Sequence, residues 1–179
     1  MVGLAAITAL PGGDDNAGPI GVLFYLAGYA MTNLAAFSVI VAVTHKTNND
    51  SISSFSGLAK ASPLIAGAMT LAMISLIGIP PTVGFMAKIY LFGAAMDTGL
   101  EWLAIVGVVN SVISAYYYLR VVKVMFLSDP EKNGEDSKTS YGVGAVSAAV
   151  IAMAGTFIFG IYPAPILRIA HTAIDSLIG

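Results

Sequence analysis

The stretch that decides the fold is SLIGIPPTVGFMAKIYLF, residues 75–92, an apolar run that contains two adjacent prolines and one cation. Pro80 and Pro81 stand in its middle, and Lys88 follows them in a segment with no acidic residue. Proline has no backbone N–H, and its ring clashes with the preceding turn, so it breaks or kinks a helix. The stretch therefore predicts a broken helix beside an uncompensated positive charge.

The composition places this broken helix in a membrane. Hydrophobic residues make up 57% of the chain and charged residues 10%, where a soluble domain has about 25% charged residues. The mean hydropathy is +0.84. A soluble core of this chain length cannot bury so much apolar surface, so we expect lipid to surround the protein.

The same composition argues against several kinds of chemistry. The net charge of −2 comes without a basic stripe, which argues against nucleic-acid binding. The absence of cysteine excludes disulfides, thiolate nucleophiles, Fe–S clusters and zinc-thiolate sites. His45 and His171 lie far apart near predicted span ends, which argues against a metal site, and no glycine-rich nucleotide-binding motif occurs. We therefore expect no cofactor in this chain.

The first residues, MVGLAAITAL, are apolar but lack the basic start and the cleavage site of a signal peptide. We interpret residues 1–10 as the tail of a helix that begins earlier, and the chain as a fragment of a longer transmembrane domain. A turn, PGGDDNAG, follows at residues 11–18.

Three further apolar segments, 19–44, 101–127 and 141–162, each have about the 20 residues that a bilayer core requires. The stretch 63–96 is different, because its roughly 34 residues would reach about 51 Å as one straight helix. It is either a hairpin of two short spans or one span broken at the prolines.

The distribution of charge favours one broken span. In that topology the loops 45–62 and 128–140 lie on the same side, which also receives the end of the 101–127 span. The basic residues gathered there are Lys46, Lys60, Arg120, Lys123, Lys132 and Lys138. The opposite side holds Asp14, Asp15, Asp97, Glu101 and Arg168. This asymmetry follows the positive-inside rule. The predicted fold is an all-α transmembrane bundle of four to five spans, one of them discontinuous.

Spacing also predicts helix contacts within the spans. Small residues recur at every fourth position and predict close helix approach: Gly28, Thr32 and Ala36, then Gly107, Ser111 and Ala115. Beside the first face, Tyr25, Tyr29 and Asn33 form a polar stripe, either for interhelical hydrogen bonds or for a water-lined path.

The 101–127 span carries further polar side chains. Asn110 and Ser114 form a similar pair, for which we expect packing. The end of the span fits an interfacial aromatic belt with basic anchors: Tyr116, Tyr117, Tyr118, Arg120 and Lys123.

Lys88 is the candidate functional residue. A helix break in lipid is tolerated only where it is buried in protein or lines an aqueous cavity, and transporters place such breaks at their ion sites. A lysine near the bilayer midplane costs about 2.5–3.5 kcal/mol even on the lenient insertion scale. We interpret Lys88 as a proton relay. The alternative is that it reaches a lipid phosphate or pairs with an acid of another subunit.

Three stretches carry a resemblance to a known family. They are GYAMTNLAAFSVIVAV (28–43), SPLIAGAMTLAMISLIGIPPTVGFMAKIYLF (62–92) and VVNSVISAYYYLRVVKVMF (108–126). Together they resemble the C-terminal part of subunit N of proton-pumping NADH–quinone oxidoreductase (respiratory complex I), the counterpart of mitochondrial subunit 2. The resemblance extends over nearly the whole chain.

The resemblance implies a fourteen-helix antiporter-like subunit built from two inverted repeats. This chain would supply the tail of helix ten and helices eleven to fourteen, with the broken span as helix twelve. Lys88 falls on the family's helix-twelve lysine, which exchanges protons with the exit side in that family's proposed pathway. Pro80, Pro81 and Gly84 would shape the break, and Thr82 would offer its hydroxyl to freed carbonyls or water. The family's first repeat has no counterpart in this chain.

The function implied is proton translocation coupled to quinone reduction, as part of a multi-pass protein of the bacterial plasma (inner) membrane. NADH, FMN, Fe–S clusters and quinone would be handled by other subunits. The partners would be other membrane subunits and the lipid bilayer. Two alternatives stay open, namely a subunit of a multisubunit sodium/proton antiporter and a structural membrane-arm fragment that transports nothing.

Overall fold

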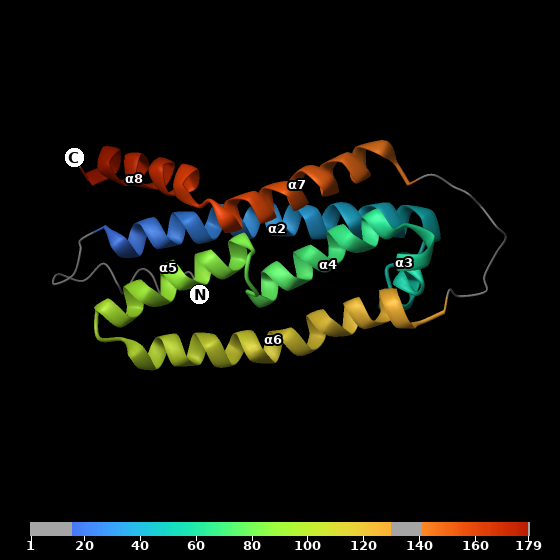
Figure 1. Cartoon of the computed structure of the whole chain (residues 1–179), viewed down its shortest axis with the longest axis horizontal. Coiled ribbons are helices and arrows are strands. Elements are labelled where there is room, and N and C mark those ends of the chain that lie inside the picture. The colour runs from blue at the N-terminus through green and yellow to red at the C-terminus, as the bar shows by residue number, and fades with distance from the viewer. Residues whose placement is uncertain (1–15, 130–140, 179) are drawn as a thin grey trace.

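The computed structural model describes residues 16–129 and 141–178, and these residues are helical with no strand (Figure 1). The elements are α2 (Ala17–Thr47), the 3-10 turn η1 (Ile52–Phe55), α3 (Leu58–Ala61), α4 (Pro63–Ile77), α5 (Val83–Asp97), α6 (Glu101–Leu127), α7 (Val143–Ile161) and α8 (Ala164–Ile178). By length and apolar composition α2, α6 and α7 are each able to cross a membrane. The helix tail predicted at residues 1–10 lies outside the described residues, as do Lys132 and Lys138.

The stretch that holds the prolines forms two short helices placed end to end. α4 and α5 have 15 residues each, about 22 Å, and neither crosses a core of about 30 Å alone. In Figure 1 α5 continues the course of α4, and both run between α2 and α6. The single broken span that the charges predicted is therefore confirmed, and the hairpin alternative is wrong.

The end of α2, the short helix α3 and the end of α6 lie at one end of the bundle (Figure 1). Lys60 Nζ is 3.2 Å from a carboxylate oxygen of Asp129, an exposed ion pair that joins α3 to the end of α6. Lys46 Nζ lies 4.5 Å from the centre of the Tyr141 ring, just before α7 begins. Figure 1 shows this end opposite the turn between α5 and α6, so Lys46, at the end of α2, and Lys60, in α3, lie away from that turn.

α2 is the central helix, and its small-residue face is buried as the spacing predicted. A Cβ atom on Gly28 would lie only 2.9 Å from a methyl group of Val83, so the backbones of α2 and α5 approach closely there. Thr32 and Ala36 on the same face are 1% and 4% exposed. The main core cluster joins α2 to α4 and includes Ala35, Ala36, Val39, Val43, Ile65, Ala66, Met69, Ala72 and Met73.

α8 is a helix that the sequence analysis did not predict. It begins after Tyr162 and Pro163, where α7 ends, and it is only 15 residues long. Ile166, Ala170 and Ile174, spaced by four, bury one face of α8, and the last two form a cluster with Ile20 of α2. The search for long apolar segments missed α8 because charged and polar residues occupy its other face, although the spacing of four was a helical signal.

Candidate functional site

The break between α4 and α5 is closed by hydrogen bonds within the protein. The Thr82 hydroxyl donates to the carbonyl of Ile79 at 2.7 Å, the kind of contact that its place in the break predicted. The backbone N–H of Gly84, in the first turn of α5, donates to Ser75 Oγ at 3.2 Å. These contacts satisfy groups that a helix break leaves without an intrahelical partner.

Gly84 allows the two short helices to meet. A Cβ atom at Gly84 would overlap the backbone carbonyl of Ser75, so no larger residue fits without moving α5 away from α4. Ser75 Oγ also lies 3.0 Å from the hydroxyl of Thr32, whose hydrogen is donated to Gly28 O at 2.8 Å. Ser75 is therefore the donor to Thr32. This buried pair of hydroxyls ties the break to α2.

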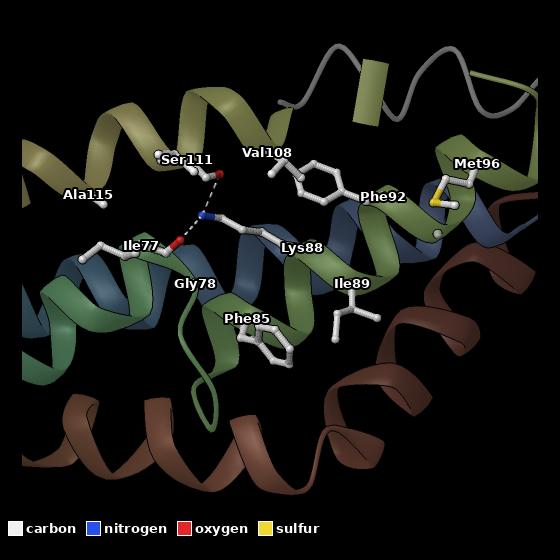
Figure 2. A pocket seen from close by; sticks show the side chains of 12 residues that line it. Ile77, Gly78, Phe85, Lys88, Ile89, Phe92, Met96, Val108, Ser111 and Ala115 are labelled. Carbon is white, nitrogen blue, oxygen red and sulfur yellow. Dashed lines mark hydrogen bonds between the residues drawn. The ribbon is translucent and has the colours of Figure 1, made fainter. Parts of the chain in front are cut away.

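Lys88 connects the two sides of the break. Its Nζ donates to the carbonyl of Leu76 at 3.1 Å. It also donates to the carbonyl of Ile77 at 2.6 Å and to Ser111 Oγ of α6 at 3.1 Å (Figure 2). An ammonium group has three N–H donors, so all three are used. The two carbonyls belong to the C-terminal turn of α4, where the helix dipole favours a cation.

No carboxylate lies within ion-pair distance of Lys88 in the part of the chain that the structure describes. The lysine instead binds backbone and hydroxyl oxygen atoms of its own chain.

Gly78 provides the space for the Lys88 side chain. Its φ of +90° lies in the left-handed region, which ends α4 and is favourable for glycine. A Cβ atom there would lie 2.9 Å from Lys88 Cδ and 3.0 Å from Nζ. The sequence analysis did not single out Gly78, although a glycine at the end of an apolar helix and shortly before proline is a helix-ending signal.

Two cavities meet at Lys88. The first, here called the apolar cavity, has a volume of about 630 Å³. Its lining comes from α5, α6 and the end of α4 (Figure 2): Ile77, Gly78, Phe85, Lys88, Ile89, Phe92, Gly93, Met96, Val108, Ser111, Val112 and Ala115. The second, the polar cavity, has about 140 Å³ and is lined by Tyr25, Tyr29, Leu76, Lys88, Asn110, Ser111, Ser114, Tyr117 and Tyr118. Lys88 and Ser111 line both cavities, so their hydrogen bond lies at the boundary.

The structure brings two of the three residues of the predicted polar stripe to Lys88. The rings of Tyr25 and Tyr29 are stacked with centroids 5.8 Å apart, and both line the polar cavity. The amide of Asn33 donates to the carbonyl of Tyr29 at 2.8 Å, and Asn33 does not line the polar cavity.

α6 contributes more to the site than the sequence predicted. Asn110 and Ser114, for which packing was expected, line the polar cavity instead. Tyr117 and Tyr118, attributed to an aromatic belt, line it as well. Among the described residues no group of three or more His, Cys, Asp or Glu side chains is placed to hold a metal ion.

Comparison with known families identifies the kind of protein. The sequence model of the family described as "NADH:quinone oxidoreductase/Mrp antiporter, TM" matches residues 2–114, which include the broken helix and Ser111. The chain belongs to this family.

Similar relatives include proteins named as subunit N of NADH-quinone oxidoreductase. The chain is 45% identical over 158 residues to "NADH-quinone oxidoreductase subunit N" of Desulfitobacterium hafniense, covering 88% of this chain and 31% of the relative. It is 43% identical over 166 residues to the subunit of the same name from Chloroflexus aggregans, covering 92% and 33%. The chain thus spans about a third of the length of these relatives.

Solved structures show the same fold. A chain of the Mrp complex from a Dietzia species matches with a TM-score of 0.72 and 24% identity, covering 88% of this chain and 37% of that one. A chain of respiratory complex I from Thermus thermophilus matches with a TM-score of 0.64 and 25% identity, covering 93% and 42%.

Proposed function

We propose that this chain is part of a subunit N-type membrane subunit of a proton-pumping NADH–quinone oxidoreductase. Such a subunit moves protons while other subunits reduce quinone. The observation that carries the proposal is the position of Lys88, whose ammonium group lies at a helix break and at the boundary of a polar and an apolar cavity. The names of the relatives from D. hafniense and C. aggregans support the assignment to subunit N.

In this function Lys88 holds the transferred proton. The carbonyls of Leu76 and Ile77 and the hydroxyl of Ser111 accept its three hydrogen bonds, which replace the water that a charged amine has outside the membrane. The polar cavity is the side from which water reaches the amine, since tyrosine, serine and asparagine side chains line it.

The remaining chemistry belongs to other subunits. NADH, FMN, Fe–S clusters and quinone are bound elsewhere in the complex, and the partners of this chain are other membrane subunits and lipid. The protein resides in the bacterial plasma membrane. The end that carries Lys46 and Lys60 faces the cytoplasm, by the positive-inside rule.

The experiment that tests this function replaces Lys88 by methionine in the complete complex. Methionine is of similar length and cannot carry a proton. Proton pumping driven by NADH oxidation is measured in membrane vesicles, together with the amount of assembled complex. We expect pumping to be lost while assembly is retained.

The control is Lys60→Met, which removes an exposed ion pair with Asp129 that contributes little to stability. Pumping by this variant should equal that of the wild type. Unchanged pumping in Lys88→Met would instead mean that the lysine is a structural contact, and the interpretation as a fragment that transports nothing would replace the relay.

A second candidate function is that of a sodium/proton antiporter subunit. It is favoured by the family match, whose description names the Mrp antiporter beside the quinone oxidoreductase. Vesicles without any redox substrate distinguish the two. Proton flux that depends on sodium supports the antiporter, whereas flux that appears only with NADH supports the oxidoreductase.

A further inference from the structure

Ser111 differs in kind from the other two partners of Lys88. The carbonyl oxygens of Leu76 and Ile77 only accept hydrogen bonds, whereas a hydroxyl both donates and accepts. Ser111 Oγ accepts from Lys88 Nζ at 3.1 Å and donates its own hydrogen to Gly107 O at 2.9 Å. Ser111 is thus the one residue bonded to Nζ that carries a transferable hydrogen.

This difference matters when Lys88 changes its protonation state. A neutral amine keeps two N–H donors and exposes one lone pair, which needs a donor. Neither carbonyl supplies one, but the Ser111 hydroxyl does so by rotating away from Gly107 O, since hydroxyl hydrogens rotate freely. The contact between Lys88 and Ser111 therefore persists in both states with its direction reversed.

Ser111 also lines the polar cavity, together with Lys88 and further polar side chains. Ser114 donates to the backbone carbonyl of Ser111 at 2.7 Å and not to its hydroxyl, whose second lone pair is left for a water in the cavity. The volume of about 140 Å³ has room for several waters at about 30 Å³ each. The side chains that face them carry hydroxyl or amide groups: Tyr25, Tyr29, Asn110, Ser114, Tyr117 and Tyr118.

We propose that the Ser111 hydroxyl passes the proton between the polar cavity and Lys88. A hydronium ion in the cavity gives a proton to Ser111 Oγ, forming one O–H bond, while the original O–H bond breaks and its hydrogen forms the third N–H bond of the ammonium. Release toward the cavity is the reverse. This inference rests on the proposed function and adds a second relay residue to it.

The test compares Ser111→Thr with Ser111→Val in the complete complex. The two side chains have nearly the same shape, and only threonine has the hydroxyl. The measurement is the number of protons pumped per NADH oxidised in vesicles. We expect Ser111→Thr to retain pumping and Ser111→Val to lose it to the level of Lys88→Met, with equal amounts of assembled complex.

Thr70→Val is the matched control. Its hydroxyl makes the same kind of bond to a carbonyl four residues earlier, that of Ala66 at 2.7 Å, but it lines neither cavity. Removing this hydroxyl should leave pumping unchanged.

The outcomes separate the two proposals. Normal pumping by Ser111→Val overturns the relay through Ser111, while loss of pumping in Lys88→Met still supports the role of the lysine. If the threonine and valine variants both fail, Ser111→Ala decides because it adds no volume: loss supports the relay, and normal pumping overturns it. Normal pumping by Lys88→Met overturns the proposed function itself.

Discussion

Two requirements meet at Gly78, the residue where α4 ends and the Lys88 side chain passes. The backbone has a φ of +90°, and the space that a Cβ atom would fill is occupied by the Lys88 side chain. The positive φ affects only the backbone conformation and therefore the stability. The space beside Gly78 affects the position of the Lys88 amine and therefore proton transfer.

We predict that Gly78→Ala lowers pumping beyond what its effect on stability explains. The left-handed backbone costs about 1–2 kcal/mol for any residue with a Cβ atom. The added methyl group also displaces Nζ from the carbonyls of Leu76 and Ile77. The measurement is pumping per assembled complex in vesicles.

Gly99→Ala is the matched control, because Gly99 has a φ of +73° but no atom lies within 4 Å of its would-be Cβ. It should show the loss of stability without the loss of pumping. Equal pumping by the two variants would mean that the position of the amine beside Gly78 is not critical.

Among single residues, the sequence predicted the helix break and Lys88 but missed several residues that line the cavities around Lys88. Lys88 stood out because it is an uncompensated charge in an apolar run, and Thr82 because its hydroxyl is able to bind carbonyls freed by the break. Ser111 and Tyr117 did not, because small and aromatic residues also occur at helix contacts and membrane interfaces. Their role depends on which way α6 is rotated relative to α5, and spacing within one helix does not contain that information.

Among the helices, α7 covers the break on the side away from α6 (Figure 1). A Cβ atom on Gly160 would overlap the carbonyl of Pro81 and the backbone of Thr82. The last turn of α7 therefore lies directly against the backbone that connects α4 to α5. This contact covers one side of the connecting backbone, while Ile79, Pro80 and Pro81 stay exposed.

We predict that Gly160→Ala destabilises the assembled protein by roughly 1–3 kcal/mol, the usual cost of overpacking. The methyl group has no space unless α7 moves away from the break. The measurement is the temperature at which the chain leaves the detergent-solubilised complex. Gly144→Ala on the same helix, with no atom within 4 Å of its would-be Cβ, should not lower that temperature. Equal temperatures for both variants would show that α7 is not held against the break.

The helices differ in how well the sequence predicted them. Long apolar runs predicted α2, α6 and α7 because lipid imposes a minimum length on each span. α8 is shorter and has polar residues on one face, so hydropathy alone did not reveal it. Its place beside α2 follows from the contact of Ala170 and Ile174 with Ile20, which links residues far apart in the chain.

For the whole molecule, the direction of water access follows from where the polar groups lie. Ser114, Tyr117 and Tyr118 follow Ser111 toward the end of α6 that contacts the loop of Lys60. The residues of α5 that line the apolar cavity, such as Phe92 and Met96, lie toward the opposite turn. Charge asymmetry in the sequence predicted which loops share a side, but the cavities required the packed helices.

We predict that water reaches the site from the side of the loops. The chain has no cysteine, so single cysteines serve as reporters. In the complete complex, a membrane-impermeant thiol reagent added on the loop side should modify Tyr117→Cys faster than Phe92→Cys, because the reactive thiolate forms in water. Faster modification of Phe92→Cys would place water access on the other side.

The contact of Gly160 with Pro81 and Thr82 also places two helix interruptions side by side. Residues 78–82 separate α4 from α5, and residues 162–163 separate α7 from α8 next to the same contact. Continuous backbone hydrogen bonding makes a helix stiff along its axis. The hydrogen bonding is interrupted between α4 and α5 and, beside it, between α7 and α8, whereas α2 and α6 continue past this level without interruption. We expect any bending of the bundle to concentrate at this level, because α2 and α6 alone among the described helices beside the break continue through it.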